Sequence, residues 1–361
     1  MKSPRKTLAA ALAFAGVLIA FAGTASAQAT YSIAPVAPGN CAPASINDVS
    51  SVAGSCDGTA VVWVGGTAKN LGRLAGGTFS DAAYINSLGV AVGDGDTGNG
   101  RPQSWVTAAS GLNNFFPNNG GNTHALFIGE NGYIGGYYTK SLSGGVSGWH
   151  GAIWVQDPKD PTRYRETDLP ILPGGVNSKF SGAVPQAFNQ LGQAAGYGQN
   201  DQIGQHAVFW NNDAKHSIVD LGVFGSDLSS LGLGINDAGQ AVGESHPPFG
   251  SRPILWNDDA AHTAIELPLL PGDNYGSAHS INNLGQILGT SSYATPGTWN
   301  VLSTRNVIWR DGGVYDLQSL LDPVTGAGWT LTYVAGMNNL GQIVGIGLDN
   351  GTSAVFVMTP Q

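Results

Sequence analysis

Charged side chains are scarce in this chain of 361 residues, and the positive ones are scarcest. Asp, Glu, Lys and Arg together make up 11% of it, under half of the ~25% of an average soluble domain. The 15 Lys and Arg are outnumbered by 24 Asp and Glu, so the formal net charge is −9. Because a basic surface is needed to hold a phosphate backbone, we expect no nucleic-acid partner. The same composition excludes a coiled coil or other long-helix protein.

Long hydrophobic runs are missing too, apart from one near the N-terminus. A positively charged start with Lys2 and Lys6 precedes an apolar run over residues 8–22, and residues 25–27 read Ala-Ser-Ala. This pattern predicts a signal peptide over residues 1–27, which implies export to the periplasm or to the outside of the cell. No other segment approaches the ~20 apolar residues of a membrane helix. We therefore expect a secreted protein with no membrane span.

Cysteine is almost absent, with only Cys41 and Cys56 in the chain. Export would place both in an oxidising compartment. Residues 47–50 form a predicted hairpin turn centred between Asp48 and Val49, so positions 41 and 56 face each other across the two strands. The sequence therefore predicts a disulfide between Cys41 and Cys56.

Glycine, in contrast, is abundant, with 54 residues, roughly twice the ~7% share of an average protein. Much of it belongs to a repeated motif, Ile-Asn-x-x-Gly-x-x-x-Gly. Ser50 replaces the first Gly of one copy and Gly129 replaces the Asn of another. The seven copies are Ile46–Gly54, Ile85–Gly93, Ile128–Gly136, Phe188–Gly196, Ile235–Gly243, Ile281–Gly289 and Met337–Gly345.

Each copy of this motif predicts a β-hairpin. Asn begins a type I turn and the first Gly takes the left-handed position that follows it. A third strand is predicted by a short apolar run that ends in Trp, and Val357 takes the Trp position in the seventh copy. A fourth strand is predicted by runs such as Asp220-Leu221-Gly222. The third-strand tryptophans are Trp63, Trp105, Trp154, Trp210, Trp256 and Trp309.

Four short antiparallel strands repeated seven times predict an all-β, seven-bladed β-propeller. We expect one such domain over residues 28–361. The seventh unit ends after its third strand, at Gln361, and residues 32–39 resemble the fourth strand at residues 168–174. The N-terminal strand is therefore expected to complete the last blade and close the ring.

The run His206-Ala207-Val208-Phe209-Trp210, together with the repeated Ile-Asn-x-x-Gly-x-x-x-Gly and Asp-Leu-Gly motifs, resembles the HAF family of probable extracellular repeat proteins. The resemblance covers nearly the whole chain after the signal peptide. It implies an exported repeat protein and carries no particular activity.

Familiar catalytic, cofactor and metal motifs are missing. The chain has no Gly-x-Ser-x-Gly, no His-Glu-x-x-His and no Cys-x-x-Cys, so we expect neither a cofactor nor a metal centre. The segment 93–98 loosely resembles a calcium loop through Asp94 and Asp96, but Gly98 stands where a third ligand is expected. Calcium at these two residues and a plain solvated loop remain open alternatives.

Aromatic residues outside the repeat positions give the first candidate site. They fall in loops from the second to the third strand or from the fourth strand to the next unit, and topology places both kinds of loop on one face. Exposed rings suit the flat faces of sugars, although the same rings could simply pack these loops down. The predicted ligand-binding residues are Trp149, Trp299, Trp329, Tyr137, Tyr138 and Tyr293.

Polar residues on the innermost strands give the second candidate site. The polar residues two or four positions before the apolar residue of the motif, where other units have Ala or Leu, are Asp81, His124, Gln186, His279 and Tyr333. His and Tyr could act as base and acid in a lyase or hydrolase, or these residues could line a wet channel. Glycosidases need two facing carboxylates, and Asp81 alone is visible on these strands.

These observations favour a binding role over catalysis. The first hypothesis is a non-enzymatic, monomeric propeller that binds an extracellular glycan or protein through its loop face. The alternatives are a polysaccharide lyase or glycoside hydrolase with its site in the central funnel, and a structural surface protein.

Overall fold

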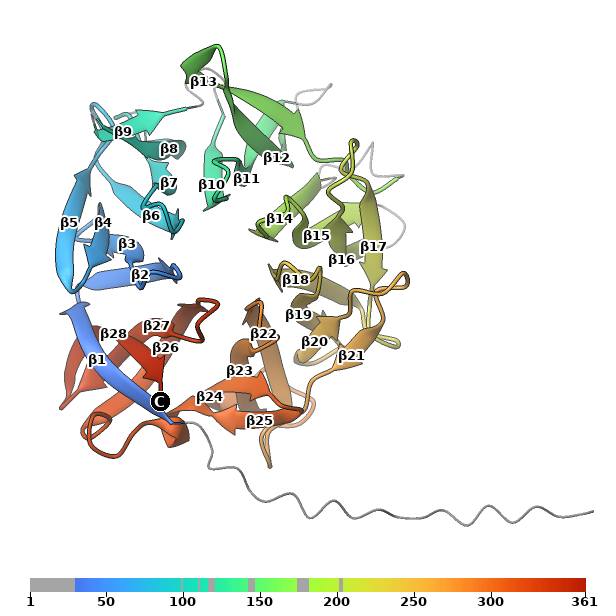
Figure 1. Cartoon of the computed structure of the whole chain (residues 1–361). Helices are drawn as coiled ribbons and strands as arrows, with labels where there is room; N and C mark the ends of the chain where they lie inside the picture. The colour runs from blue at the N-terminus through green and yellow to red at the C-terminus, as the bar shows by residue number, and fades with distance from the viewer. Residues whose placement is uncertain are drawn as a thin grey trace, which may run out of the picture.

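The computed structural model describes residues 30–98, 100–109, 111–115, 121–141, 147–173, 182–200 and 204–361. The predicted signal peptide, residues 1–27, lies outside the described residues. These ranges form 28 β-strands and one short 3-10 helix, η1 (Leu317–Leu320). The strands make five four-stranded sheets and one eight-stranded sheet, which stand side by side in a ring (Figure 1). No helix in the described ranges is long and apolar enough to cross a membrane.

Each sheet runs outward from the centre of the ring (Figure 1). The innermost strands are β2 (Cys41–Ile46), β6 (Ser80–Ile85), β10 (Thr123–Ile128), β14 (Gly182–Phe188), β18 (Ser229–Ile235), β22 (Tyr275–Ile281) and β26 (Trp329–Met337). Their hairpin partners are β3 (Val52–Cys56), β7 (Ala91–Gly95), β11 (Ile134–Ser141), β15 (Ala194–Asn200), β19 (Ala241–His246), β23 (Ile287–Ala294) and β27 (Ile343–Asp349).

The outer half of each sheet is built in the same way. The third strands are β4 (Thr59–Val64), β8 (Gln103–Ala108), β12 (Ser147–Asp157), β16 (Gly204–Trp210), β20 (Arg252–Trp256), β24 (Val301–Arg310) and β28 (Thr352–Pro360). The outermost strands are β5 (Thr67–Gly72), β9 (Gly111–Asn114), β13 (Asp160–Asp168), β17 (Ile218–Gly222), β21 (Ala264–Glu266), β25 (Gly313–Asp316) and β1 (Tyr31–Pro38).

The eight-stranded sheet consists of two four-stranded antiparallel groups, β10 to β13 and β14 to β17. A single parallel residue pair, His150 with Ala183, joins the two groups. All other strand pairs in this sheet are antiparallel and follow the pattern of the other sheets.

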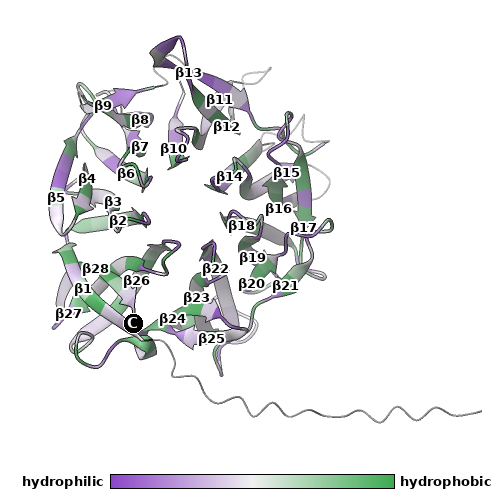
Figure 2. Cartoon of the chain, viewed as in Figure 1, coloured by the Kyte–Doolittle hydropathy of each residue, from purple (hydrophilic) through white to green (hydrophobic). Residues whose placement is uncertain are grey.

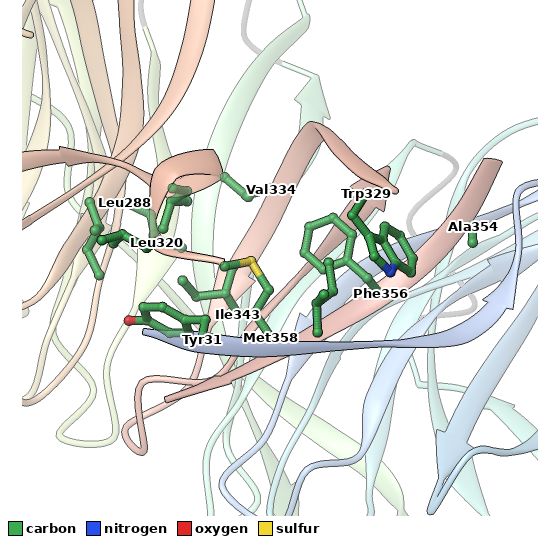
Figure 3. Packing of buried hydrophobic residues seen from close by; sticks show 12 residues of the cluster. Tyr31, Leu288, Leu320, Trp329, Val334, Ile343, Ala354, Phe356 and Met358 are labelled. Carbon is green, nitrogen blue, oxygen red and sulfur yellow. The ribbon is translucent and has the colours of Figure 1, made fainter. Parts of the chain in front are cut away.

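The two ends of the chain lie in the same sheet. Strand β1 pairs antiparallel with β28 from Tyr31 opposite Pro360 to Pro38 opposite Ala354, which confirms the expected role of the N-terminal strand. Its inward side chains are buried with residues of the last two sheets. In this core Trp329 lies edge-on to Phe356, 5.8 Å between ring centroids (Figure 3).

The repeated turn has the predicted geometry. In the second copy the Gly89 N–H donates to the Asn86 carbonyl, and Gly89 has a φ of +79°. Ser50 takes the same left-handed conformation with a φ of +62°, where a side chain costs roughly 1–2 kcal/mol relative to glycine. Figure 2 shows hydrophilic residues at these turns, around the centre of the ring.

The motif asparagines also link the sheets to one another. Each buried side-chain amide donates from Nδ2 to a carbonyl of the next turn around the ring, and we call this set the Asn belt. The links run from Asn47 to Asn86, Asn86 to Gly129, Asn189 to Asn236, Asn236 to Asn282, Asn282 to Asn338 and Asn338 back to Asn47, with N···O distances of 2.8–3.2 Å.

Tyr133 supplies the link that Gly129 cannot make. Its hydroxyl donates to the carbonyl of Asn189, which closes the belt through all seven turns. Four other turns have Gln at the position of Tyr133, and the Gln oxygen accepts from the belt Asn, as Gln286 does from Asn282 at 2.9 Å. The Gly-Tyr pair therefore replaces an Asn-Gln pair.

Replacing Tyr133 by Phe is expected to lower the free energy of unfolding by about 1–2 kcal/mol, because the buried carbonyl of Asn189 loses a donor.

Gly129→Asn alone should also destabilise the fold, since the new Cβ would lie 2.6 Å from Cε1 of Tyr133. The double variant Gly129→Asn/Tyr133→Gln restores the common pair. Urea denaturation of Gly129→Asn, Tyr133→Gln and the double variant measures the loss of unfolding free energy in each. The loss in the double variant should be smaller than the sum of the losses in the two single variants. Strict additivity would contradict this role of Tyr133.

The six repeat tryptophans fill the space between sheets, each at most 3% exposed. One sequence assignment is corrected. Met358, and not Val357, takes the tryptophan position in the last sheet, because it pairs with Ile343 as Trp309 pairs with Ile287. The tight turn between β27 and β28 fixes this register, which counting along the apolar run does not show.

The predicted disulfide is present. Cys41 and Cys56 are directly opposite each other on β2 and β3 and are joined by a disulfide bond. Cys41 packs with Val344 and Val355 of the last sheet, so the bond lies beside the junction of the first and last sheets.

Candidate ligand-binding site

One group of side chains brings titratable and aromatic residues together across two neighbouring sheets. It consists of Asp81 on β6, Asp94 on β7, His124 on β10, Tyr137 on β11 and Trp149 on β12, and we call it the His124 cluster. Asp81 pairs with Asp94, and His124 with Tyr137, in their hairpins. Residues at such positions point to the same face of a sheet.

Asp94 connects the two sheets. Its Oδ2 lies 2.5 Å from Nδ1 of His124, while Oδ1 accepts from the Ala125 N–H and from Ser104 Oγ, both at 3.1 Å. The carboxylate thus has a partner on each oxygen, and it holds the imidazole of His124 in one orientation.

Aromatic rings form the other side of the cluster. The ring of His124 stacks on Tyr137 with 4.8 Å between centroids, and Trp149 meets Tyr137 edge-on at 5.2 Å. Trp149 is also 5.5 Å from His124. Because Trp149 remains 37% exposed, part of this ring surface is open to a ligand.

Desolvation and the charge of Asp94 act together on the titratable groups of the cluster. Partial desolvation and the neighbouring charge of Asp94 raise the pKa of Asp81, although an N–H from Asp94 and the nearby His124 oppose this. Desolvation and Asp94 also raise the pKa of Tyr137. The site therefore favours positive or neutral groups over anions.

Two of the predicted ligand-binding rings are corrected to core positions. Tyr138 is 1% exposed, and its hydroxyl oxygen lies 2.9 Å from a carboxylate oxygen of Glu166 and 2.8 Å from one of Asp168, which share its single hydrogen. Trp329 is 6% exposed and packs in the core of the last sheet. Both rings are packed in hydrophobic cores, so neither offers a ring face to a ligand.

Trp299 and Tyr293 are exposed, at 63% and 41%, but they are far along the chain from the His124 cluster: Tyr293 is on β23 and Trp299 is in the loop between β23 and β24. The ring centroid of Phe249, in the loop between β19 and β20, is 6.2 Å from that of Trp299. Sequence reasoning missed Phe249, which has no repeat position to mark it as unusual. Phe249 and Trp299 make a second exposed aromatic pair on the propeller.

The four candidate catalytic residues do not form one site. Asp81 and His124 are in the His124 cluster, whereas His279 lines the central cavity of about 280 Å³. Burial there lowers the pKa of His279 to about 4. Tyr333 is on β26 and largely exposed. Sequence reasoning missed the contact of Asp94 with His124, since nothing in the order of residues pairs these two strands.

His279 belongs to a set of bulge residues. Each innermost strand carries an extra residue opposite its hairpin partner that lines the cavity, and β26 carries a second one, Thr332, that does not. The set is Ala44, Ala83, Leu126, Gln186, Leu233, His279 and Ala335. Five of the seven are apolar, which makes this part of the channel a poor place for acid–base chemistry.

Asp94 and Asp96 do not converge on a shared cation site. The buried Asp96 accepts from the N–H groups of Thr78 at 2.6 Å, Phe79 at 3.0 Å and Gly98 at 3.1 Å, and these bonds lower its pKa. Asp94 is turned toward His124. In the ranges that the structure describes, no three His, Cys, Asp or Glu residues are grouped to hold a metal ion.

Comparison with known proteins supports the fold alone. No family model and no curated protein matches the chain. The chain is similar to the β-propeller domain of the Trilobed protease from Pyrococcus furiosus, with a TM-score of 0.51 and 11% identity over 92% of this chain and 97% of that one. It has a β-propeller fold. That domain is described as having an open velcro topology, whereas here β1 pairs with β28.

The chain is also similar to an acylaminoacyl peptidase from Pyrococcus horikoshii, with a TM-score of 0.51 and 10% identity. The match covers 89% of this chain and 52% of the peptidase, so the chain spans about half the length of that protein. At such identities the likeness extends to the propeller architecture and to nothing chemical.

Proposed function

We propose that this protein is an exported, seven-bladed β-propeller repeat protein of the HAF type that binds an extracellular glycan without catalysis. Counting the eight-stranded sheet as two blades gives seven, and the Asn belt passes through seven turns. The disulfide and the missing membrane helices in the described ranges are compatible with export.

The observation that carries the binding role is the His124 cluster. Its half-exposed Trp149, backed by Tyr137 and His124, offers a ring surface that suits the C–H face of a sugar. The carboxylate of Asp81, which is near enough to His124 to interact with its charge, is an acceptor for hydroxyl groups of a ligand. A rigid scaffold holding a few polar groups next to aromatic rings is the usual composition of a small-ligand site.

Catalysis is a weaker second candidate, and one observation supports it: the raised pKa of Asp81, which suits a general acid. Glycoside hydrolysis also needs a second carboxylate free to act on the sugar or on water. Asp94 does not meet this need, because both of its oxygens already accept or share hydrogens within the protein.

Trp149→Ala is expected to weaken glycan binding at least tenfold, because the ring provides the exposed stacking surface and ~1.4 kcal/mol corresponds to a factor of ten. A glycan array selects the oligosaccharide, and calorimetric titration gives the dissociation constants. Val324→Ala, at an 82% exposed loop position, is the control and should leave affinity unchanged. Equal affinity of wild type and Trp149→Ala would contradict the proposal.

A reducing-end assay on the same oligosaccharides separates binding from hydrolysis, and absorbance of unsaturated products detects a lyase. The proposal expects no product. Product formation that is lost in Asp81→Asn would establish the enzymatic alternative. A structural surface protein, in turn, would bind no member of the array.

A further inference from the structure

The sign of the charge in the His124 cluster narrows the class of ligand. The charged groups that act on Asp81 are Asp94 on β7 and His124 on β10. If His124 is protonated, its charge offsets that of Asp94, and the negative charge of Asp81 remains. If His124 is neutral, the negative charges of both carboxylates remain. The cluster is therefore negative in either protonation state of His124.

Asp81 also has hydrogen-bonding capacity to spare. Its Oδ1 accepts the Asp94 N–H at 3.2 Å. Within the described ranges, the structure gives its Oδ2 no donor from another residue, and the side chain is exposed. An external donor can therefore reach Asp81 without displacing an existing partner.

The aromatic members favour the same kind of ligand. The faces of Trp and Tyr rings attract ammonium groups, and a carboxylate beside such rings adds charge pairing and a strong hydrogen bond. A uronic acid would instead meet one or two like charges. Neutral sugars would gain the stacking but not the charge pairing.

We propose that the glycan bound at the His124 cluster carries free amino groups, as in a polymer of glucosamine, with the ammonium on Asp81 and the sugar ring against Trp149. This inference rests on the proposed glycan-binding function. Because the pKa of Asp81 is raised, affinity should fall as the pH drops through that pKa, while the ammonium stays charged.

The test titrates four oligosaccharides of equal length into the protein: a glucosamine oligomer, an N-acetylglucosamine oligomer, a cellulose oligomer and an oligogalacturonate. Wild type should bind the glucosamine oligomer at least tenfold tighter than the N-acetylated one. Asp81→Asn should remove this preference, because it weakens binding of the glucosamine oligomer at least tenfold more than binding of the N-acetylated one. Asp311→Asn, which removes an exposed carboxylate between β24 and β25, is the control for general attraction to an acidic protein and should keep the preference.

The outcomes separate the two proposals. Binding of the uncharged oligomers through Trp149 with no preference for the amine overturns this inference and leaves the binding function in place. Preference for the uronate overturns it as well. If a preference for the amine falls equally in Asp81→Asn and Asp311→Asn, the attraction is nonspecific and the site is not the His124 cluster. Binding of none of the four overturns the proposed function itself.

Discussion

Gly289→Ala is expected to lower the free energy of unfolding by about 3 kcal/mol, at the upper end of what overpacking costs. A Cβ on Gly289 would fall well inside van der Waals contact with the carbonyl oxygen of Ser277 on the paired strand. It would also lie 2.6 Å from Cζ3 of the buried Trp309. Neither group can move away, because one is backbone in a hairpin and the other fills the space between sheets.

The same reason explains the second Gly of the motif in every copy. A Cβ at any of these positions would meet the carbonyl of the first strand at the start of its bulge. The positions are Gly54, Gly93, Gly136, Gly196, Gly243, Gly289 and Gly345. The first Gly answers a different demand, the left-handed turn conformation, and Ser50 shows that it can be replaced.

Gly336→Ala is the matched control for this prediction. Gly336 is also a strand residue near the channel, and the nearest atom to an added Cβ is the carbonyl oxygen of Ala44 at 3.7 Å. That distance is ordinary contact, so the expected change is under ~1 kcal/mol. Urea denaturation of both variants measures the difference, and similar stabilities for the two would contradict the steric account.

Removing the disulfide by the double substitution Cys41→Ala/Cys56→Ala is expected to cost about 3 kcal/mol, the loop-entropy value for a link across ~15 residues. The substitution should weaken the contact between the first and the last sheet, where the ring closes, because Cys41 packs with Val344 and Val355 of the last sheet. Thermal denaturation of the variant against wild type gives the size of the effect.

Intact mass after alkylation provides the control for this prediction. Without reductant the wild-type mass should not change, and after unfolding and reduction two alkyl groups should be added. Two groups added without reductant, or a variant as stable as wild type, would contradict a stabilising disulfide.

The order of residues predicted the local hairpins and their repetition because the signals are local. An Asn three residues before a Gly specifies a turn, and the short spacing to the Trp run specifies the next strand. The pairing of β1 with β28 was also predictable, since residues 32–39 resemble a fourth strand that the last unit lacks. The Cys41–Cys56 pair followed from turn position alone.

The contacts between sheets were not predictable in this way. The belt Asn appeared only as a turn residue, because its second role depends on the carbonyl of a neighbouring turn some 40 or more residues away. The sequence shows Gly129 in place of the Asn but does not show that the Tyr133 hydroxyl replaces the missing amide as donor. Tyr138 and Trp329 looked exposed for a related reason: loop residues and strand ends differ by only a position or two.

The candidate site shows the same limit. Asp81 and His124 stood out from the sequence as polar residues on innermost strands, and Trp149 as an extra tryptophan. Their proximity to Asp94 depends on how two neighbouring sheets pack, and the spacing of residues in the sequence does not show this. His279, chosen by the same sequence rule, turned out to be a bulge residue, and the bulge residues of five other innermost strands are apolar.

Hydrogen–deuterium exchange with and without saturating oligosaccharide tests the central claim, glycan binding at the His124 cluster, most directly. The account predicts slower exchange in peptides that cover β6, β7 and β10 to β12, with no change in peptides that cover the repeated turns of the other sheets. Unchanged exchange in those strands, with protection confined to the region of Trp299 or to the channel turns, would contradict it.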